Sequence, residues 1–131
     1  MTGNRSYIRA IVIDCRDPER LAVFWSQLLG STIASRTGPY VWLTIPGDGP
    51  VLGFQRVDEP TPGKNRTHMD LAFPDPVAER ERIEALGGRW LEQYTEGGFL
   101  VMADPEGNEF CVIPEGSVGL DSQGRANYLN G

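Results

Sequence analysis

The sequence DCRDPERLAVFWSQLLG at residues 14–30 has a counterpart, FPDPVAERERIEALGG, at residues 73–88. The Asp17-Pro18 pair of the first stretch returns 58 residues later as Asp75-Pro76. With no gap, the same offset aligns four more pairs of identical residues, namely Leu28 and Leu86, Gly30 and Gly88, Thr37 and Thr95, and Gly49 and Gly107. We therefore predict two copies of one structural unit that pair to close a common core, with a pocket along the seam between them.

Each copy is predicted to begin with a strand and a helix. The β-rich runs AIVID (10–14) and HMDLAF (68–73) each end shortly before an Asp-Pro pair. Aspartate accepts hydrogen bonds from the amides of a first helical turn and proline suits the first helical position, so helices are expected to start at Pro18 and Pro76. Gly30 is expected to supply the left-handed end of the first helix. Apolar residues recur at helical spacing, densely after Pro18 (Leu21, Phe24, Trp25 and Leu28) and sparsely after Pro76 (Val77, Ile83 and Leu86).

Further β-rich runs follow each helix and are separated by glycine-rich turns. We predict an α+β fold in which residues 1–131 form one domain of two tandem βαβββ modules. The first module is expected at about residues 7–57 and the second at about 68–113. The polar, proline-containing stretch 58–67 is predicted to link them, and residues 114–131, which lack periodicity, to form an extended or mobile tail.

Composition excludes some classes of partner. At 131 residues and 40% hydrophobic content, the chain is large enough for a core. A formal net charge of −6 and a pI near 4.7 argue against nucleic acid as a partner. No signal peptide or bilayer-spanning stretch is recognised, which predicts a cytoplasmic protein. Cys15 and Cys111 do not occupy equivalent positions of the repeat, so thiols are expected rather than a disulfide.

Three stretches resemble the vicinal oxygen chelate superfamily, also called the glyoxalase/bleomycin-resistance/dioxygenase fold. They are DCRDPERLAVFWSQLLG, HMDLAFPDP and VMADPEGNEFCVI, and the resemblance covers about residues 7–113. It implies a cup-shaped sheet, completed in a homodimer, in some members with modules exchanged between subunits. The superfamily contains metal-dependent isomerases, dioxygenases and thiol transferases as well as metal-free proteins that sequester antibiotics. Fold similarity cannot choose among these activities.

The resemblance also assigns four metal-binding positions. In the family's enzymes, one ligand lies at the start of each module's first strand and one near the end of its last strand. These positions correspond to Ala10, Gly53, His68 and Cys111 in this chain. Ala10 and Gly53 offer no ligating side-chain atom, so this quartet is degenerate and no metal or other cofactor is expected.

Other roles for the polar residues near the quartet stay open. Asp70, Gln55 and Glu109 each lie two residues from a quartet position on the same strand face, which would permit a displaced metal site. His68 is the only histidine and is interpreted as a hydrogen-bond partner for a ligand, as a general base, or as an inert remnant. Cys111 is expected to be a buried, unreactive thiol rather than a nucleophile.

Aromatic residues provide the remaining signal. Tyr40, Trp42, Trp90, Tyr94 and Phe99 lie on or beside predicted strands. Rings suit flat, conjugated ligands, because stacking contributes ~1 kcal/mol beyond burial, but they also fill small cores. Strand alternation places one set of residues (Tyr40, Trp42 and Thr44) opposite an aliphatic set that is expected to pack on the helices (Val41, Leu43 and Ile45).

We therefore expect a metal-independent protein, with no catalytic residue, that sequesters an aromatic or polycyclic antibiotic of bleomycin, mitomycin or enediyne type and confers resistance. The residues expected to bind this ligand are Tyr40, Trp42, Gln55, His68, Asp70, Trp90, Phe99, Met102 and Cys111. The alternative is a metal-dependent glyoxalase-type lyase, isomerase or dioxygenase. A third hypothesis is an accessory module without a small ligand.

Overall fold

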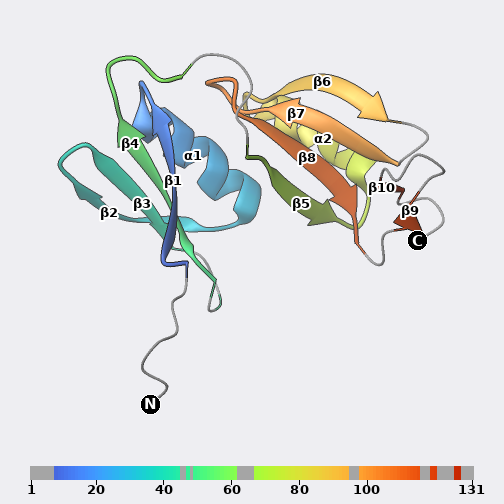
Figure 1. The fold of residues 1–131 in the computed structure, drawn as a ribbon, viewed down its shortest axis with the longest axis horizontal. Helices are drawn as coiled ribbons and strands as arrows, with labels where there is room; N and C mark the ends of the chain where they lie inside the picture. Colours follow the sequence, from blue (N-terminus) through green and yellow to red (C-terminus); the bar gives the residue numbers. More distant parts are fainter. Residues whose placement is uncertain are drawn as a thin grey trace. The chain divides into compact units, whose positions relative to one another are not determined.

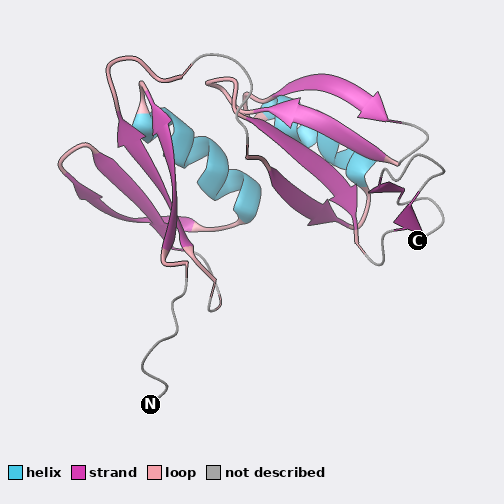
Figure 2. Ribbon diagram, in the orientation of Figure 1, coloured by secondary structure: helices cyan, strands magenta, loops and turns pink. Residues whose placement is uncertain are grey.

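The computed structural model describes residues 8–44, 47, 49–61, 67–94, 98–115, 119–120 and 126–127. The chain divides into two compact units, Met1–Pro60 and Thr61–Gly131 (Figure 1). The boundary falls within residues 58–67, of which residues 62–66 lie outside the described part. In each unit, a helix lies against one face of a four-stranded sheet, as βαβββ modules require (Figure 2).

The first unit contains a sheet of strand order β1-β4-β3-β2. Strand β1 pairs in parallel with β4, whereas the other neighbouring pairs are antiparallel. The elements are β1 (Ala10–Cys15), α1 (Pro18–Leu29), β2 (Thr32–Thr37), β3 (Tyr40–Thr44) and β4 (Val51–Arg56).

The second unit repeats this topology with the order β5-β8-β7-β6, and β5 again pairs in parallel with β8. Its elements are β5 (Met69–Phe73), α2 (Pro76–Ala85), β6 (Arg89–Tyr94), β7 (Phe99–Ala103) and β8 (Glu109–Pro114). Neither α1 nor α2, among the described residues, is long and apolar enough to cross a membrane.

The tail predicted at residues 114–131 is described only in part. Strand β8 extends to Pro114, and a short antiparallel pair follows, β9 (Gly119–Leu120) with β10 (Ala126–Asn127). Strands of two residues are too short to show a period-two pattern, which explains why the sequence did not reveal them. The other residues beyond 115 lie outside the described part.

Both helices start where the Asp-Pro pairs predict. The carboxylate of Asp17 accepts a hydrogen bond from the amide of Arg20 at 3.1 Å, and that of Asp75 accepts one from the amide of Ala78 at 3.3 Å. Gly30 ends α1 in the left-handed conformation, with φ of 67°, as expected.

The two helices differ in how much they bury. Helix α1 buries the predicted apolar stripe together with Ala22, whereas Ile83 is the buried residue of α2. The expectation that Val77 shares this stripe is wrong, because 62% of Val77 is exposed. Six positions of a helix separate Val77 from Ile83, which places the two side chains about 120° apart around the axis.

The repeat extends to the pairing register of the strands. In the first unit Val12 lies opposite Gly53, and in the second Asp70 lies opposite Cys111, at the same 58-residue offset. Across the next strand, Trp42 lies opposite Gly53 whereas Val101 lies opposite Cys111, an offset of 59. One additional residue therefore precedes β7 in the second unit.

Candidate functional site

Each sheet has one face covered by its helix and one face turned away from it. In the first unit the buried side chains of Val41, Leu43, Leu52 and Phe54 are on the helix-covered side, and they alternate with Tyr40, Trp42 and Gln55 on the open face. Alternation thus places Tyr40, Trp42 and Thr44 together, as predicted. Val41 and Leu43 are on the buried side, and Ile45 lies outside the described residues.

An aromatic platform, defined as Tyr40 and Trp42, occupies this open face. The two rings are stacked, with centroids 5.4 Å apart and planes inclined by 15°. The indole also lies across Gly53, since a Cβ atom at that position would be 2.4 Å from Trp42 Cε3 and Cζ3. Glycine at position 53 therefore permits the indole to lie this close to the neighbouring strand.

Polar groups lie beside the platform in the same row of the sheet. Gln55 is paired with Tyr40 on one side and with Asp14 of β1 on the other. Asp14 is exposed and Gln55 is partly exposed. Sequence reasoning overlooked Asp14, although the 58-residue offset places it at the end of the strand equivalent to β5.

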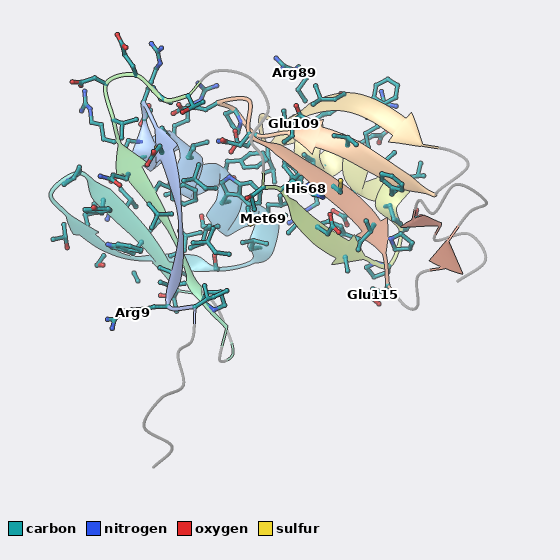
Figure 3. All side chains as sticks on the ribbon, viewed as in Figure 1. Arg9, His68, Met69, Arg89, Glu109 and Glu115 are labelled. Carbon is teal, nitrogen blue, oxygen red and sulfur yellow. The ribbon has the colours of Figure 1, made fainter. Side chains whose placement is uncertain are left out.

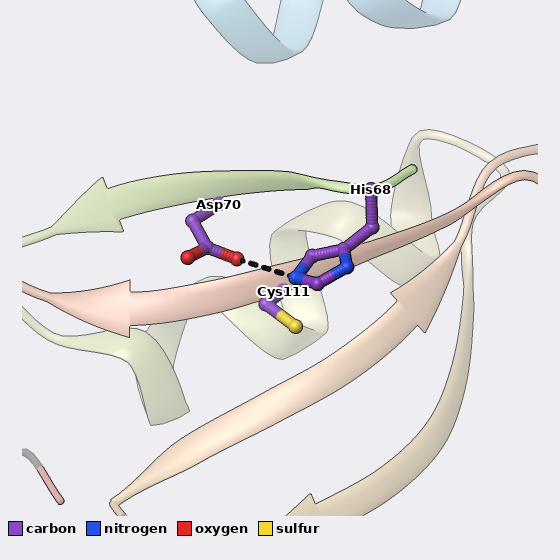
Figure 4. Close-up of side chains that lie close together, drawn as sticks. All are labelled: His68, Asp70 and Cys111. Carbon is purple, nitrogen blue, oxygen red and sulfur yellow. Dashed lines mark ion pairs between the residues drawn. The ribbon is translucent and has the colours of Figure 1, made fainter. Parts of the chain in front are cut away.

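The open face of the second unit holds a different set of side chains. His68 Nε2 lies 3.2 Å from Asp70 Oδ1, and about half of each side chain is exposed. Cys111 Sγ joins them, because one ligand atom from each residue lies within 4.8 Å of the others. Figure 4 shows the three side chains beside β5 and β8. We name this group the His68–Asp70–Cys111 cluster.

Strand pairing explains why these residues meet. Asp70 and Cys111 are register partners in the parallel β5–β8 pair, and His68 lies two residues before Asp70 on the same face. Cys111 is partly exposed, so the expectation of a buried thiol is wrong. Cys15, by contrast, is buried and its thiol donates to the backbone carbonyl of Gln55 at 3.6 Å.

A turn with a buried carboxylate connects β7 to β8. Asp104 is only 3% exposed and accepts hydrogen bonds from the amides of Glu106 and Asn108 and from the Asn108 side chain. Gly107 has a φ of 88°, which this turn requires. The turn fixes how β7 and β8 pair and therefore where Cys111 lies. It is a structural element of the site that sequence reasoning treated only as a turn.

Two predicted ligand-binding residues belong elsewhere. Met102 is fully buried and pairs with buried Phe110 on the helix-covered side, so placing it in the ligand site is wrong. Trp90 pairs with Met102, and the guanidinium of Arg80 in α2 lies 3.8 Å from its ring centroid. Trp90 therefore also faces α2 rather than the open face. Val101 faces the open side with Cys111, so strand alternation puts its neighbour Met102 on the opposite, helix-covered side. This could have been predicted from the sequence.

Phe99 occupies the position in β7 that Tyr40 occupies in β3. It is partly exposed and lies two residues from Val101, which pairs with Cys111 on the open face. Its neighbour in β6 is Tyr94, whose side chain lies outside the described residues. Phe99 is thus placed on the same face as the His68–Asp70–Cys111 cluster.

The four metal positions implied by the family resemblance do not fit a complete metal site. Ala10 has no ligating atom, and the Trp42 ring fills the space that any side chain at Gly53 would need. Glu109 begins β8 and is labelled with His68 in Figure 3, but the cluster found among the described residues does not include it. The quartet thus retains only His68 and Cys111, both in the second unit.

Ion pairs also lie on the surface of each unit, away from the open sheet faces. The guanidinium of Arg36 in β2 forms two hydrogen bonds with the carboxylate of Glu19 in α1. These hydrogen bonds lower the pKa of Glu19 and raise that of Arg36. In α2, Arg80 pairs with Glu84 and Arg82 with Glu79 along the exposed helix surface.

Several solved structures share the fold at low sequence identity. A glyoxalase-related enzyme from Fulvimarina pelagi is 18% identical, with a TM-score of 0.69 over 95% of this chain and 99% of that chain. The fosfomycin resistance protein FosX from Listeria monocytogenes is 16% identical, with a TM-score of 0.66 over 88% and 94%. The trypanothione-dependent glyoxalase I of Leishmania major is 16% identical, with a TM-score of 0.68 over 85% and 88%.

A comparison with curated proteins gives no match. The family model of the glyoxalase-like domain, however, matches residues 10–113, a stretch that runs from the first residue of β1 into β8. The two βαβββ units and the structural neighbours agree with this match. This chain therefore belongs to the glyoxalase-like family of the vicinal oxygen chelate superfamily.

Proposed function

We propose that this chain is a metal-independent binding protein that sequesters a planar aromatic or polycyclic antibiotic, of bleomycin, mitomycin or enediyne type, and so confers resistance. The observation that carries this proposal is the aromatic platform. Tyr40 and Trp42 lie stacked and partly exposed on the face of the sheet that α1 leaves open. A flat ligand gains from such rings about 1 kcal/mol per stacked pair beyond burial.

The platform is held in its binding geometry before any ligand arrives. Trp42 is restrained by Tyr40 on one side and by the backbone of Gly53 beneath it. A rigid aromatic anchor loses little conformational entropy on binding, which is the general advantage of preorganised sites. A solvent-facing ring pair in this state is better suited to binding than to filling a core.

Polar neighbours indicate which ligands the platform suits. Gln55 and Asp14 extend the Tyr40 row across β4 and β1, so an amide and a carboxylate lie beside the rings. They can accept hydrogen bonds from amino or amide groups at the edge of a flat ligand. The formal charge of −6 is consistent with a neutral or cationic ligand rather than an anionic one.

The names of two structural neighbours support the resistance class. One is a fosfomycin resistance protein and another is described as a glyoxalase/bleomycin resistance protein from Albidiferax ferrireducens. At 16% and 18% identity these likenesses concern the fold. In this chain, the degenerate quartet favours binding over metal-assisted turnover.

The proposal is tested by calorimetry with a panel of polycyclic and DNA-damaging antibiotics on chelator-treated protein. Replacing Trp42 by Ala should weaken binding about thirtyfold, since loss of a rigid aromatic anchor costs ~2 kcal/mol. Trp90→Ala is the matched control, because it removes the same ring from the helix-covered side. Gln55→Ala, which removes the amide beside the Tyr40 ring, should cost about 1 kcal/mol, the net value of one neutral hydrogen bond. An equal loss of ligand affinity in Trp42→Ala and Trp90→Ala would contradict the proposal that the ligand binds on the aromatic platform.

A metal-dependent glyoxalase-type lyase, isomerase or dioxygenase is the second candidate. The observation that favours it is the His68–Asp70–Cys111 cluster. If this hypothesis holds, metal-loaded protein turns over a glyoxalase or dioxygenase substrate, and chelation or His68→Ala abolishes that turnover.

We also propose that the chain works as a twofold homodimer in the cytoplasm. Each four-stranded sheet ends in edge strands, β1 and β2 in one unit and β5 and β6 in the other, and proteins generally cover such edges. The thiols of Cys15 and Cys111 are suited to a reducing compartment. Light scattering at micromolar concentration tests the dimer, and a monomer that binds ligand normally would contradict it.

A further inference from the structure

We infer that the His68–Asp70–Cys111 cluster is a binding site for Zn²⁺ built entirely within the second unit. The cluster combines an imidazole, a carboxylate and a thiol on one open sheet face, with one ligand atom from each residue within 4.8 Å of the others. This inference is independent of the aromatic platform, and it deepens the second candidate function, whose metal site it specifies.

The distances suit a single small cation. Zinc binds nitrogen and carboxylate oxygen at about 2.0–2.2 Å and thiolate sulfur at about 2.3 Å, so tetrahedral ligand atoms lie roughly 3.3–3.8 Å apart. His68 Nε2 and Asp70 Oδ1 are already 3.2 Å apart. Because no two of the ligand atoms are more than 4.8 Å apart, bringing Cys111 into the same shell needs a movement of at most about an ångström. The His68 and Asp70 side chains are about half exposed, so they can also shift toward the Cys111 thiol.

The donor set selects the kind of metal. Hard cations such as Mg²⁺ and Ca²⁺ prefer shells of oxygen atoms, and this cluster offers one carboxylate. Imidazole and thiolate favour zinc and other borderline or soft ions. Three protein ligands leave a fourth position open to water or to a small ligand, which is the arrangement of catalytic rather than structural zinc sites.

The repeat shows that the fold itself does not require these residues. Ala10, Val12 and Gly53 occupy the equivalent positions in the first unit, at the same strand register. All three lack a ligating side-chain atom. The second copy therefore carries three donors where the first copy carries none, and two of those donors project from a strand pair whose register brings them together.

This site differs from the four-ligand site implied by the family resemblance. That site would take two residues from each unit and uses nitrogen and carboxylate oxygen. The His68–Asp70–Cys111 cluster instead uses one unit, includes a thiol, and recruits Asp70, which is not among the four positions.

The experiment is a calorimetric Zn²⁺ titration of the full, tag-free chain after chelator treatment under reducing conditions. We expect one Zn²⁺ per chain. His68→Ala, Asp70→Asn and Cys111→Ser should each reduce the affinity more than about 100-fold, because loss of an outer-shell partner alone costs about 10–100-fold. The matched control is Asp14→Asn, which removes an exposed carboxylate from the open face of the first unit and should leave the affinity unchanged.

Cobalt provides a second readout that does not depend on affinity alone. Co²⁺ bound at this cluster should show a sulfur-to-metal charge-transfer absorption, and Cys111→Ser should remove it. Circular dichroism is the check that each variant remains folded, and we expect it to be so because the three residues are exposed or partly exposed.

Three outcomes would overturn the inference. They are absence of Zn²⁺ binding by the unmodified chain, binding that survives any of the three ligand substitutions, and Co²⁺ binding without a sulfur signal. Trp42→Ala should not alter Zn²⁺ affinity, so failure of the platform proposal and failure of the zinc site are distinguishable.

Discussion

The open faces of the two units occupy the same positions of one repeated fold and differ in chemistry. Where the first unit has Ala10, Val12 and Gly53, the second has His68, Asp70 and Cys111 at the same register. The first face carries a stacked pair of rings, and the second carries a cluster of metal-ligating groups. The repeated backbone thus places side chains at equivalent positions, and the chemistry of those side chains differs between the units.

The same contrast extends to the helix-covered faces. Helix α1 buries five residues, including Phe24 and Trp25, which meet edge to face with ring centroids 5.5 Å apart. Helix α2 has Ile83 as its buried residue and pairs its charged residues along its surface. Among the described residues, α1 therefore contributes more buried side chains to its unit than α2 does, and the core of the second unit comes mainly from β7 and β8.

The largest expected effect on stability comes from a substitution that disrupts the packing of the first unit. Trp25→Ala should lower the free energy of unfolding by about 4 kcal/mol, because removing a buried tryptophan loses its transfer energy and leaves a cavity. Its equivalent in the repeat is Ile83, and Ile83→Ala should cost less, about 3 kcal/mol. Urea unfolding followed by circular dichroism measures both. Val77→Ala is the exposed control and should change stability by less than about 0.5 kcal/mol.

A loss for Ile83→Ala that exceeds the loss for Trp25→Ala would contradict this difference. It would mean that the smaller core of the second unit depends more strongly on each of its members than the larger core does.

The next effect tests the polar turn of the second unit. Asp104→Ala removes the acceptor for the amides of Glu106 and Asn108, and should destabilise the protein by about 2–3 kcal/mol. Asp104→Asn keeps one acceptor oxygen and should cost less. Amide hydrogen exchange in β7 and β8 should rise in the Ala variant while exchange in the first unit stays unchanged. Faster exchange in both units alike would show that the turn does not act locally.

A smaller effect concerns the platform. Gly53→Ala places a methyl group against the Trp42 ring, and the displaced indole should cost about 1–2 kcal/mol. The double variant with Trp42→Ala should recover part of that loss, giving a measurable coupling energy. The equivalent change in the second unit, Cys111→Ala, only shortens a side chain. A neutral or stabilising Gly53→Ala would show that the indole does not need the glycine.

The smallest effect is a pH dependence in the first unit. Arg36 lowers the pKa of the exposed Glu19 carboxyl below its ordinary value of 4.5. Because the folded pKa is the lower one, the stabilisation is present above pH 4.5 and is lost as the pH falls through the folded pKa. Glu19→Gln should therefore be slightly less stable than the unmodified chain at neutral pH. The difference should vanish in acid, and a difference that persists there would exclude this ion pair as its source.

Local rules in the sequence were sufficient for the elements. Asp17-Pro18 and Asp75-Pro76 predicted both helix starts, because capping and the fixed φ of proline depend only on neighbouring residues. The 58-residue offset predicted two βαβββ units. Alternation then separated Tyr40 and Trp42 from the buried face of β3.

Contacts between strands were decided only by the tertiary structure. The approach of Trp42 to Gly53 depends on the register of β3 against β4, and the cluster depends on that of β5 against β8. Cys111 lies 41 residues beyond Asp70 in the sequence, so no local pattern pairs them; the family resemblance assigned His68 and Cys111 to one site, and strand register adds Asp70. One additional residue before β7 also shifts the offset, which changes the residue that faces Cys111. Register is set by hydrogen bonds between distant segments and by burial of one whole face, and these exist only once the chain has folded.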